Sequence, residues 1–220
     1  MITLVVEAST YSGSAVVLDG ATVIAERSVA MRGRYHEALM PAVAALLRDA
    51  GLTPSQVERV VCGAGPGAFT SLRVGASIAK GIAMGADAPL VPISSLALLV
   101  ASQREFLPGR YLAAVDAMRG EHYVQLFSID SGAMQALSEV SIVPSADVER
   151  HAAEASATAI GPDRGGEHSV TPQARALARI TNMIDQATPA DLAEWEPGYG
   201  RLAEAQVKWE AQHGRALPPR

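Results

Sequence analysis

The segment that decides the fold reads Gly63-Ala64-Gly65-Pro66-Gly67-Ala68-Phe69-Thr70-Ser71-Leu72-Arg73-Val74-Gly75. It joins an apolar run over Val57–Cys62, typical of a buried strand, to a helix predicted over Phe69–Met84. A glycine-rich turn before a helix can present free backbone N–H groups to an anion. However, the segment lacks both the Lys-Ser/Thr pair of a P-loop and the three-glycine spacing of a dinucleotide-binding fingerprint. The pattern therefore favours a tight strand-to-helix connection over a phosphate site.

The helix that follows this turn is unusually rich in small residues. Gly75, Ala79 and Ala83 recur every four residues and so share one helical face, and Gly81 and Gly85 lie beside them. A glycine inside a helix costs about 1 kcal/mol relative to alanine, so these positions need a reason. A face of small residues lets another backbone come close. The periodicity leaves open whether that backbone belongs to the chain's own sheet or to a partner.

Strands and helices alternate through the first half of the chain. Asp19-Gly20 is a hairpin signal between two apolar runs, and Gly51 is placed to end the first helix. The predicted elements are strands at Ile2–Val6, Ala15–Leu18, Thr22–Val29, Val57–Cys62 and Pro89–Ile93, and helices at His36–Ala50, Phe69–Met84 and Ser94–Ser102. This order predicts an α/β domain whose helices flank a mixed sheet.

A domain boundary is expected at Phe106-Leu107-Pro108-Gly109, which divides a lobe of residues 1–105 from a smaller lobe of residues 106–220. The second lobe is predicted to hold strands at Tyr111–Val115, His122–Ser128 and Met134–Ile142, and a helix at Val148–Ala157. A last helix is expected to start at Thr171-Pro172, with an apolar stripe through Leu177, Ile180 and Ile184.

Composition and net charge limit the classes of function that the chain can have. The chain has 220 residues and a formal net charge of −5. Binding to a polyanion depends on neutralising its phosphates with Lys and Arg side chains. The negative net charge therefore argues against a protein that binds RNA without a partner. The single cysteine, Cys62, fits a reducing cytosol, and we expect a cytoplasmic location. No apolar run is long enough to span a bilayer, and Ile2–Val6 is interpreted as a strand rather than a signal peptide.

Four stretches of the chain, in order, carry a family resemblance. They are Arg34-Tyr35-His36-Glu37 with Leu39-Met40-Pro41, the glycine-rich segment with Ala79-Lys80-Gly81, Leu112-Ala113-Ala114-Val115-Asp116-Ala117 with Gly120-Glu121 and Tyr123, and Glu196-Pro197-Gly198-Tyr199-Gly200-Arg201. The second resembles the G-P-G-S-F-T-G-L-R-V-G … A-K-G segment of the TsaB (YeaZ) family. The others are similar to that family's R-x-H … L-P, I-D-A-R-x-G-E-V-Y and E-P-x-Y-L-R stretches. The resemblance implies a two-lobed actin-like ATPase (ASKHA, ribonuclease-H-like) fold with mixed sheets flanked by helices.

The resemblance also implies a role in making threonylcarbamoyladenosine at position 37 of tRNA. In that family the catalytic work belongs to a homologous TsaD subunit with a TsaE ATPase, so this chain is expected to be a scaffold that meets tRNA only through the complex. Alone, it is expected to form a homodimer. The first two helices would make the partner interface. The residues assigned to it are His36, Leu39, Val43, Leu72, Gly75, Ala76, Ala79 and Ala83.

Departures from the family pattern bear on catalysis. The first strand ends in Glu7-Ala8-Ser9 where the family usually has Asp-Thr-Ala/Ser, so Glu7, Ser9 and Asp116 are at most nucleotide-adjacent. The catalytic homologue carries a His-x-x-x-His metal pair where this chain has Ser95 and Leu99. Leucine cannot bind a metal and serine is a poor ligand. We therefore expect no metal, no cofactor and no catalytic residue in this chain.

Other candidate chemistry is sparse, and two further function classes stay open. Cys62 lies in an apolar strand and is interpreted as a buried, inert thiol. His36, beside Glu37, fits a polar helix start better than a general base, and Lys208, Arg215 and Arg220 fit a solvated end better than an RNA contact. One alternative is an ATP-dependent enzyme of the actin-like superfamily, either a kinase or a metalloprotease. The other is a homodimeric structural protein unrelated to tRNA.

Overall fold

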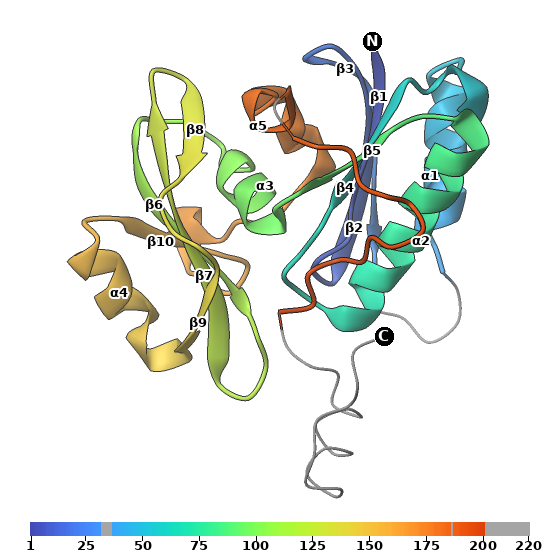
Figure 1. Ribbon diagram of the computed structural model, residues 1–220. Helices are drawn as coiled ribbons and strands as arrows, with labels where there is room; N and C mark the ends of the chain where they lie inside the picture. Colours follow the sequence, from blue (N-terminus) through green and yellow to red (C-terminus); the bar gives the residue numbers. More distant parts are fainter. Residues whose placement is uncertain (32–36, 186, 201–220) are drawn as a thin grey trace, which may run out of the picture.

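The computed structural model describes residues 1–31, 37–185 and 187–200, which form two five-stranded sheets with helices around and between them (Figure 1). The first sheet has the order β3-β2-β1-β4-β5. Its strands are β1 (Ile2–Glu7), β2 (Ser12–Asp19), β3 (Thr22–Ala30), β4 (Arg59–Gly63) and β5 (Leu90–Ile93). Strand β1 pairs antiparallel with β2 and parallel with β4, so the predicted mixed sheet is confirmed.

Two helices, α1 (Leu39–Asp49) and α2 (Phe69–Ala86), cover one face of this sheet (Figure 1). Side chains alternate between the two faces of a strand. Leu4 and Val6 of β1 accordingly share a buried cluster with the helices, whereas Val5 joins a separate cluster on the opposite face. Ala79 and Ala83 of α2 are fully buried in the helix-side cluster. The small-residue face of α2 therefore packs on the chain's own sheet.

The second sheet has the order β10-β6-β7-β8, with β9 paired to β7. Its strands are β6 (Gly109–Asp116), β7 (Glu121–Asp130), β8 (Ala133–Ala136), β9 (Ser141–Pro144) and β10 (Thr158–Ile160). Helix α4 (Val148–Glu154) packs on β6 and β10. Helix α3 (Ser95–Ala101) lies between the two sheets, and every one of its residues is buried (Figure 1). A single apolar cluster, which includes Val5, Leu96 and Phe127, therefore joins the two lobes.

The chain then returns to the first sheet. A 3-10 segment, η4 (Ala174–Arg179), contacts β2 and α3 and is followed by a short helix, α5 (Asn182–Asp185). Residues 187–200 run across α2, with the Ala190 N–H donating to the Leu90 carbonyl at 2.8 Å (Figure 1). We call residues 187–200 the strap. No helix in the three described ranges is long and apolar enough to cross a membrane.

Three local predictions are wrong. The strand predicted over Met134–Ile142 is divided into β8 and β9, because Ser138 turns the chain away and its hydroxyl accepts the Leu126 N–H. The regular helix predicted from Thr171-Pro172 is instead the irregular η4 segment followed by α5, whose N–H groups bond three residues back, as the Ile180 N–H does to the Leu177 carbonyl. The helix predicted to reach Ala157 ends at Glu154, and the chain continues into the unpredicted strand β10.

Gly75 and Gly81 make a matched pair for testing how α2 packs. A Cβ at Gly75 would lie 2.9 Å from the Ala8 Cβ, whereas a Cβ at Gly81 would meet nothing within 4 Å. Gly81→Ala should raise the free energy of unfolding by about 0.5–1 kcal/mol, the usual gain in helix propensity. Gly75→Ala should lower it, because overpacking typically costs about 1–3 kcal/mol and exceeds that gain. Urea denaturation of both variants decides the point, and equal stabilisation by both would contradict this packing.

Candidate functional site: a cleft between the lobes

A cavity of about 1540 Å³ lies between the two lobes, where the chain segments after β1 and β6 face each other. Its first wall comes from two loops of the first lobe, residues 9–11 and 67–69, and its second wall comes from β6, β7 and the loop after β10. Both walls contribute lining residues, among them Ser9, Tyr11, Phe69, Asp116, Met118, His122, Tyr123, Ile142, Ser145, Asp163, Arg164 and Tyr199. The cleft is therefore lined by residues of both lobes.

The first wall depends on a close contact between two backbones. The Ala68 N–H donates to the Ser9 carbonyl at 2.7 Å. A Cβ at Gly67 would lie only 2.1 Å from that same carbonyl oxygen, so only glycine fits there. The glycine-rich turn thus packs on the loop after β1, as expected of a tight strand-to-helix connection. Ser9 itself is almost fully buried, at 1% exposure.

Glu7 lies behind this wall and does not line the cleft. Its carboxylate accepts the Ser9 N–H at 2.5 Å and the Ser95 hydroxyl at 2.8 Å. Ser95 in turn accepts the Gly65 N–H at 3.1 Å. Burial raises the pKa of Glu7 above its ordinary value, although these hydrogen bonds act in the opposite direction. The side chain is therefore committed to the interior and not directed at a ligand in the cleft.

The buried thiol of Cys62 lies near this carboxyl, on strand β4. Burial, and secondarily the charge of Glu7, raises the pKa of the Cys62 thiol far above its ordinary value. A thiol held in its neutral form is a poor nucleophile. The prediction that Cys62 is buried is confirmed, and its chemistry is that of a small apolar residue.

The second wall carries a hydrogen-bonded cluster around His122. The imidazole is 2.9 Å through Nδ1 from the Ser145 hydroxyl and 2.7 Å through Nε2 from the Asp163 carboxylate. Arg164 pairs with Asp163 at 3.4 Å and with Glu149 at 3.1 Å. Burial opposes ionisation of Asp163, but the hydrogen bond from His122 and the charges of His122 and Arg164 lower the pKa of this carboxyl. The cluster joins β7 to the loops after β9 and β10.

The predicted nucleotide-adjacent residues are not brought together as one site. Asp116 is exposed at the end of β6, where its carboxylate accepts the Met118 N–H at 2.7 Å. This is an ordinary use of aspartate in a turn. Ser9 and Asp116 line opposite walls of the cleft, whereas Glu7 lies in the interior.

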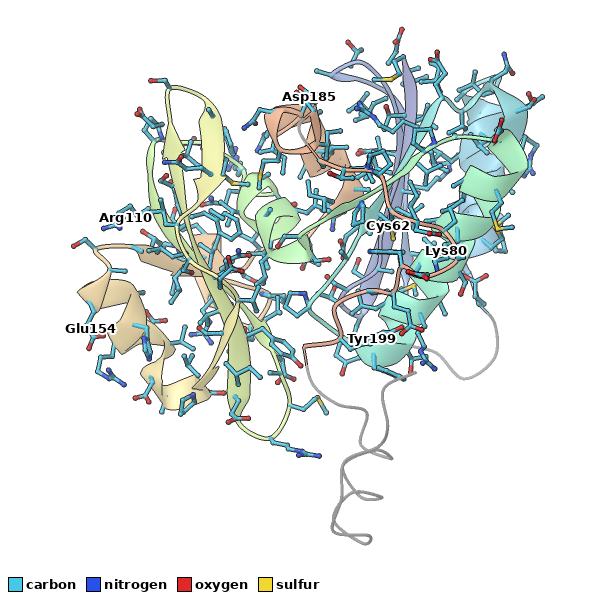
Figure 2. The ribbon with its side chains drawn as sticks, viewed as in Figure 1. Cys62, Lys80, Arg110, Glu154, Asp185 and Tyr199 are labelled. Atoms are coloured by element: carbon cyan, nitrogen blue, oxygen red, sulfur yellow. The ribbon has the colours of Figure 1, made fainter. Side chains whose placement is uncertain are left out.

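An aromatic cluster lies at the cleft, with Phe69 and Tyr199 among the residues that line it. Phe69 at the start of α2 lies 4.7 Å from Tyr199 of the strap, measured between ring centroids. The Arg73 guanidinium stacks over both rings, at 4.4 Å from the Phe69 centroid and 5.5 Å from that of Tyr199. Figure 2 shows Tyr199 at the foot of α2 and Lys80 further along the same helix. These contacts fasten the strap to the first lobe.

The residues predicted for the partner interface lie in the chain's own core. Leu39, Val43, Leu72, Gly75, Ala76, Ala79 and Ala83 are all buried, and His36 lies outside the described residues. Other side chains of α1 and α2 are exposed, among them Met40, Arg73, Ser77, Gly81 and Met84. The interface predicted on these two helices stays a prediction, and the exposed residues are those available to a partner.

Ser95 and Leu99, which stand where the catalytic homologue is expected to have its metal pair, have structural roles in this chain. Ser95 is held by Glu7 and Gly65, and Leu99 is fully buried in α3. Within residues 1–31, 37–185 and 187–200, no group of three or more His, Cys, Asp or Glu side chains is arranged to hold a metal ion.

Comparisons with known proteins agree with this architecture. The family model described as TsaD, tRNA N6-adenosine threonylcarbamoyltransferase, matches residues 28–159, which is more than half of the chain. A Bacillus subtilis protein named tRNA threonylcarbamoyladenosine biosynthesis protein TsaB is 28% identical over 95% of this chain and 98% of its own length. The protein of the same name from Haemophilus influenzae is 41% identical over 39% of this chain and 36% of its own. The chain belongs to this family, and within it to the TsaB (YeaZ) proteins.

Solved structures support the fold of this TsaB-family chain. YeaZ from Pseudomonas aeruginosa superposes with a TM-score of 0.71 at 23% identity, covering 89% of this chain and 98% of that one. A second structure, described as an uncharacterized protein with similarity to peptidase YeaZ, gives 0.73 at 22% identity, covering 91% and 99%. The predicted two-lobed α/β fold is confirmed.

Sequence analysis missed the His122 cluster and the aromatic cluster. Asp163 lies 41 residues from His122, and Tyr199 lies 126 residues from Arg73. Neither pair has a local periodic signal. The E-P-x-Y match at residues 196–199 was the one available pointer, since it marked Tyr199 without showing its neighbours.

Burial of Glu7 predicts a specific pH dependence of stability. A carboxyl whose pKa is raised by folding stabilises the folded state below its ordinary pKa of 4.5, and this contribution is lost as pH rises through the raised value. Glu7→Gln keeps the shape of the side chain but cannot ionise. The free energy of unfolding of the wild type minus that of Glu7→Gln should therefore fall as pH rises above about 4.5. Urea denaturation across this range tests it, with the exposed Glu105→Gln as control, and a constant difference would contradict it.

Proposed function

We propose that this TsaB-family chain is a non-catalytic scaffold subunit of the bacterial complex that makes threonylcarbamoyladenosine at position 37 of tRNA. The family match and the TsaB names of its relatives support the pathway. The observation that carries the scaffold role is the Glu7–Ser95 hydrogen bond at 2.8 Å. Because of this bond, the side chains of Glu7 and Ser95 point into the interior of the protein. An active relative would have its nucleotide-side carboxylate and a metal ligand at these two positions.

The proposed partner is a TsaD-like catalytic subunit, which works with a TsaE-like ATPase, and the docking surface is the exposed side of α1 and α2. Met40 is 43% and Met84 69% exposed there, which gives apolar area. Gly81 and Gly85 are exposed as well, and a Cβ at either would meet nothing within 4 Å. Another helix could approach this backbone closely. A second copy of the chain would use the same surface when the catalytic subunit is absent.

The net charge of the chain supports a proposal that other subunits of the complex bind the tRNA. A net charge of −5 gives little attraction to a polyanion, and affinity for nucleic acid comes largely from contacts between cationic side chains and phosphates. In this proposal tRNA is held by the assembled complex in the cytoplasm, and this chain contributes its fold and its helical surface.

Depletion of the chain tests the pathway. Cells without it should lose threonylcarbamoyladenosine from bulk tRNA, as measured by mass spectrometry of nucleosides, and a plasmid copy of the wild-type chain should restore it. A scaffold is required even though it performs no chemistry, because the catalytic subunit lacks its support. Normal levels of the nucleoside in depleted cells would contradict the proposal.

A matched pair of glycine variants tests the docking surface. Gly81 on α2 and Gly165 in the second lobe are both exposed, and a Cβ at either meets nothing within 4 Å. Gly81→Arg should weaken binding to the TsaD homologue of the same genome by about tenfold or more, which corresponds to about 1.4 kcal/mol or more. Gly165→Arg should bind as the wild type does. Calorimetric titration measures both, and melting curves check that both variants fold. Wild-type affinity of Gly81→Arg would reject this surface.

A further inference from the structure

The two lobes are joined at two separate places. One is the apolar cluster around α3, in which all seven residues of that helix are buried together with Val5 of the first sheet and Phe127 of the second. The other is the end of the strap, residues 198–200, which we call the clasp. Its Tyr199 lines the cleft between the lobes. Figure 1 shows α3 between the two sheets, whereas the strap ends at the foot of α2.

Three contacts seat the clasp on the first lobe. The Gly198 N–H donates to the Ala64 carbonyl in the glycine-rich turn at 2.8 Å. The Gly198 carbonyl lies so close to this turn that a Cβ at Gly65 would be 2.5 Å from its oxygen. The ring of Tyr199 lies 4.7 Å from that of Phe69, measured between centroids. The clasp is therefore fixed to the turn before α2.

A buried tyrosine of the second lobe holds the clasp from the other side. Tyr123 on β7 is 4% exposed, and its hydroxyl donates to the Tyr199 carbonyl at 3.2 Å. Burial raises the pKa of this phenol above its ordinary value, so the hydroxyl keeps its proton at neutral pH. Gly200, which has a φ of +69°, packs against the same side chain. A Cβ there would lie 2.9 Å from the Tyr123 hydroxyl oxygen and closer still to two ring carbons, so only glycine fits.

The two connections between the lobes differ in strength. Burial of apolar surface stabilises in proportion to its area, and the cluster around α3 buries a whole helix. The clasp depends on one neutral hydrogen bond to β7 and on the packing of Gly200 against a ring. Such a bond adds little net stability, because water replaces the partner when the bond breaks. Segments with few buried apolar contacts open first, so the clasp opens while the α3 cluster stays intact.

We propose that residues 198–200 are a releasable clasp across the cleft. While the Tyr123 hydroxyl holds the Tyr199 carbonyl, the lobes keep one separation, and when this contact breaks they move apart about α3. Release widens the cleft and gives another molecule access to its lining. This device belongs to the chain alone and does not depend on the proposed scaffold role, so its test needs neither a catalytic subunit nor tRNA.

Two glycine-to-alanine variants with similar backbone strain test the clasp. Gly200→Ala places a Cβ against Tyr123 and should release the clasp. Gly132→Ala, in the turn between β7 and β8, is the matched control. Gly132 has a similar φ of +79°, is exposed, and a Cβ there meets nothing within 4 Å. A third variant, Tyr123→Phe, removes only the hydroxyl and should release the clasp less completely.

Spin labels report the separation of the lobes in the full-length protein. They are attached at Ser77→Cys on α2 and Ala153→Cys on α4, two exposed positions, while Cys62 is buried and stays unlabelled. Labelled chain is diluted with unlabelled chain, so that only distances within one molecule count. Hydrogen–deuterium exchange of residues 187–200 reports the seating of the strap.

The clasp predicts a distinct pattern in both measurements. Double electron–electron resonance should give one narrow distance distribution for the parent chain and for Gly132→Ala. Gly200→Ala should broaden this distribution towards longer distances, and Tyr123→Phe should do so to a smaller extent. Exchange in the strap should become faster in these same two variants and stay unchanged in Gly132→Ala.

Three results would overturn the proposal. An unchanged, narrow distribution in both Gly200→Ala and Tyr123→Phe would show that the clasp does not set the separation of the lobes. Broadening in Gly132→Ala as well would trace the effect to backbone strain and not to the contact with Tyr123. Faster exchange in the strap at an unchanged distance would show that the strap only covers the first lobe. If circular dichroism shows that Gly200→Ala does not fold, Tyr123→Phe, which keeps the ring, decides the matter.

Discussion

The buried carboxyl of Glu7 is the interaction on which the centre of the first lobe depends. Burying a carboxyl is costly unless its oxygens are hydrogen-bonded, and here the Ser9 N–H and the Ser95 hydroxyl meet that need. The same Ser95 hydroxyl oxygen accepts the Gly65 N–H and so fixes the glycine-rich turn against α3. A Cβ at Gly63 would lie 1.8 Å from the carboxylate, so the end of β4 must be glycine. One polar group thereby positions β1, β4, α3 and the turn before α2.

Most polar groups in the walls of the cleft are hydrogen-bonded or ion-paired to neighbouring residues of the same chain. In the loop after β1, the Ser9 carbonyl accepts the Ala68 N–H, so this loop supports the glycine-rich turn before α2. On the opposite wall, His122 and Arg164 are both engaged with Asp163. Since these polar groups already hold one another, the exposed part of the cleft presents mainly aromatic and aliphatic side chains.

The sequence predicted the first half of the fold well because the signals there are local. The helix predicted over Phe69–Met84 is α2, and Asp19-Gly20 located the hairpin between β2 and β3. The second half was predicted less well, because contacts between distant residues decide it. Ser102 and Ser14 accept the N–H groups of Gln173 and Ala174 and so tie this segment to residues that lie far from it in the sequence. The nucleotide-adjacent role of Glu7, Ser9 and Asp116 stays a prediction. The structure places Ser9 and Asp116 in the lining of the cleft and Glu7 in the interior, and sequence does not show to which side of a strand end a carboxyl turns.

The glycines in and around α2 fall into two groups, according to whether a Cβ at their position would meet other atoms of the described chain. A Cβ at Gly65 would lie 2.5 Å from the Gly198 carbonyl, at Gly67 2.1 Å from that of Ser9, and at Gly75 2.9 Å from the Ala8 side chain. These three glycines of the family segment are therefore explained by packing inside the chain. Gly81 and Gly85 are different, because a Cβ at either would meet nothing in the described part of the chain and each costs helix stability. Packing among the described residues does not account for them. The buried face of α2 thus builds the lobe, whereas the exposed glycines belong to the surface that we propose for docking.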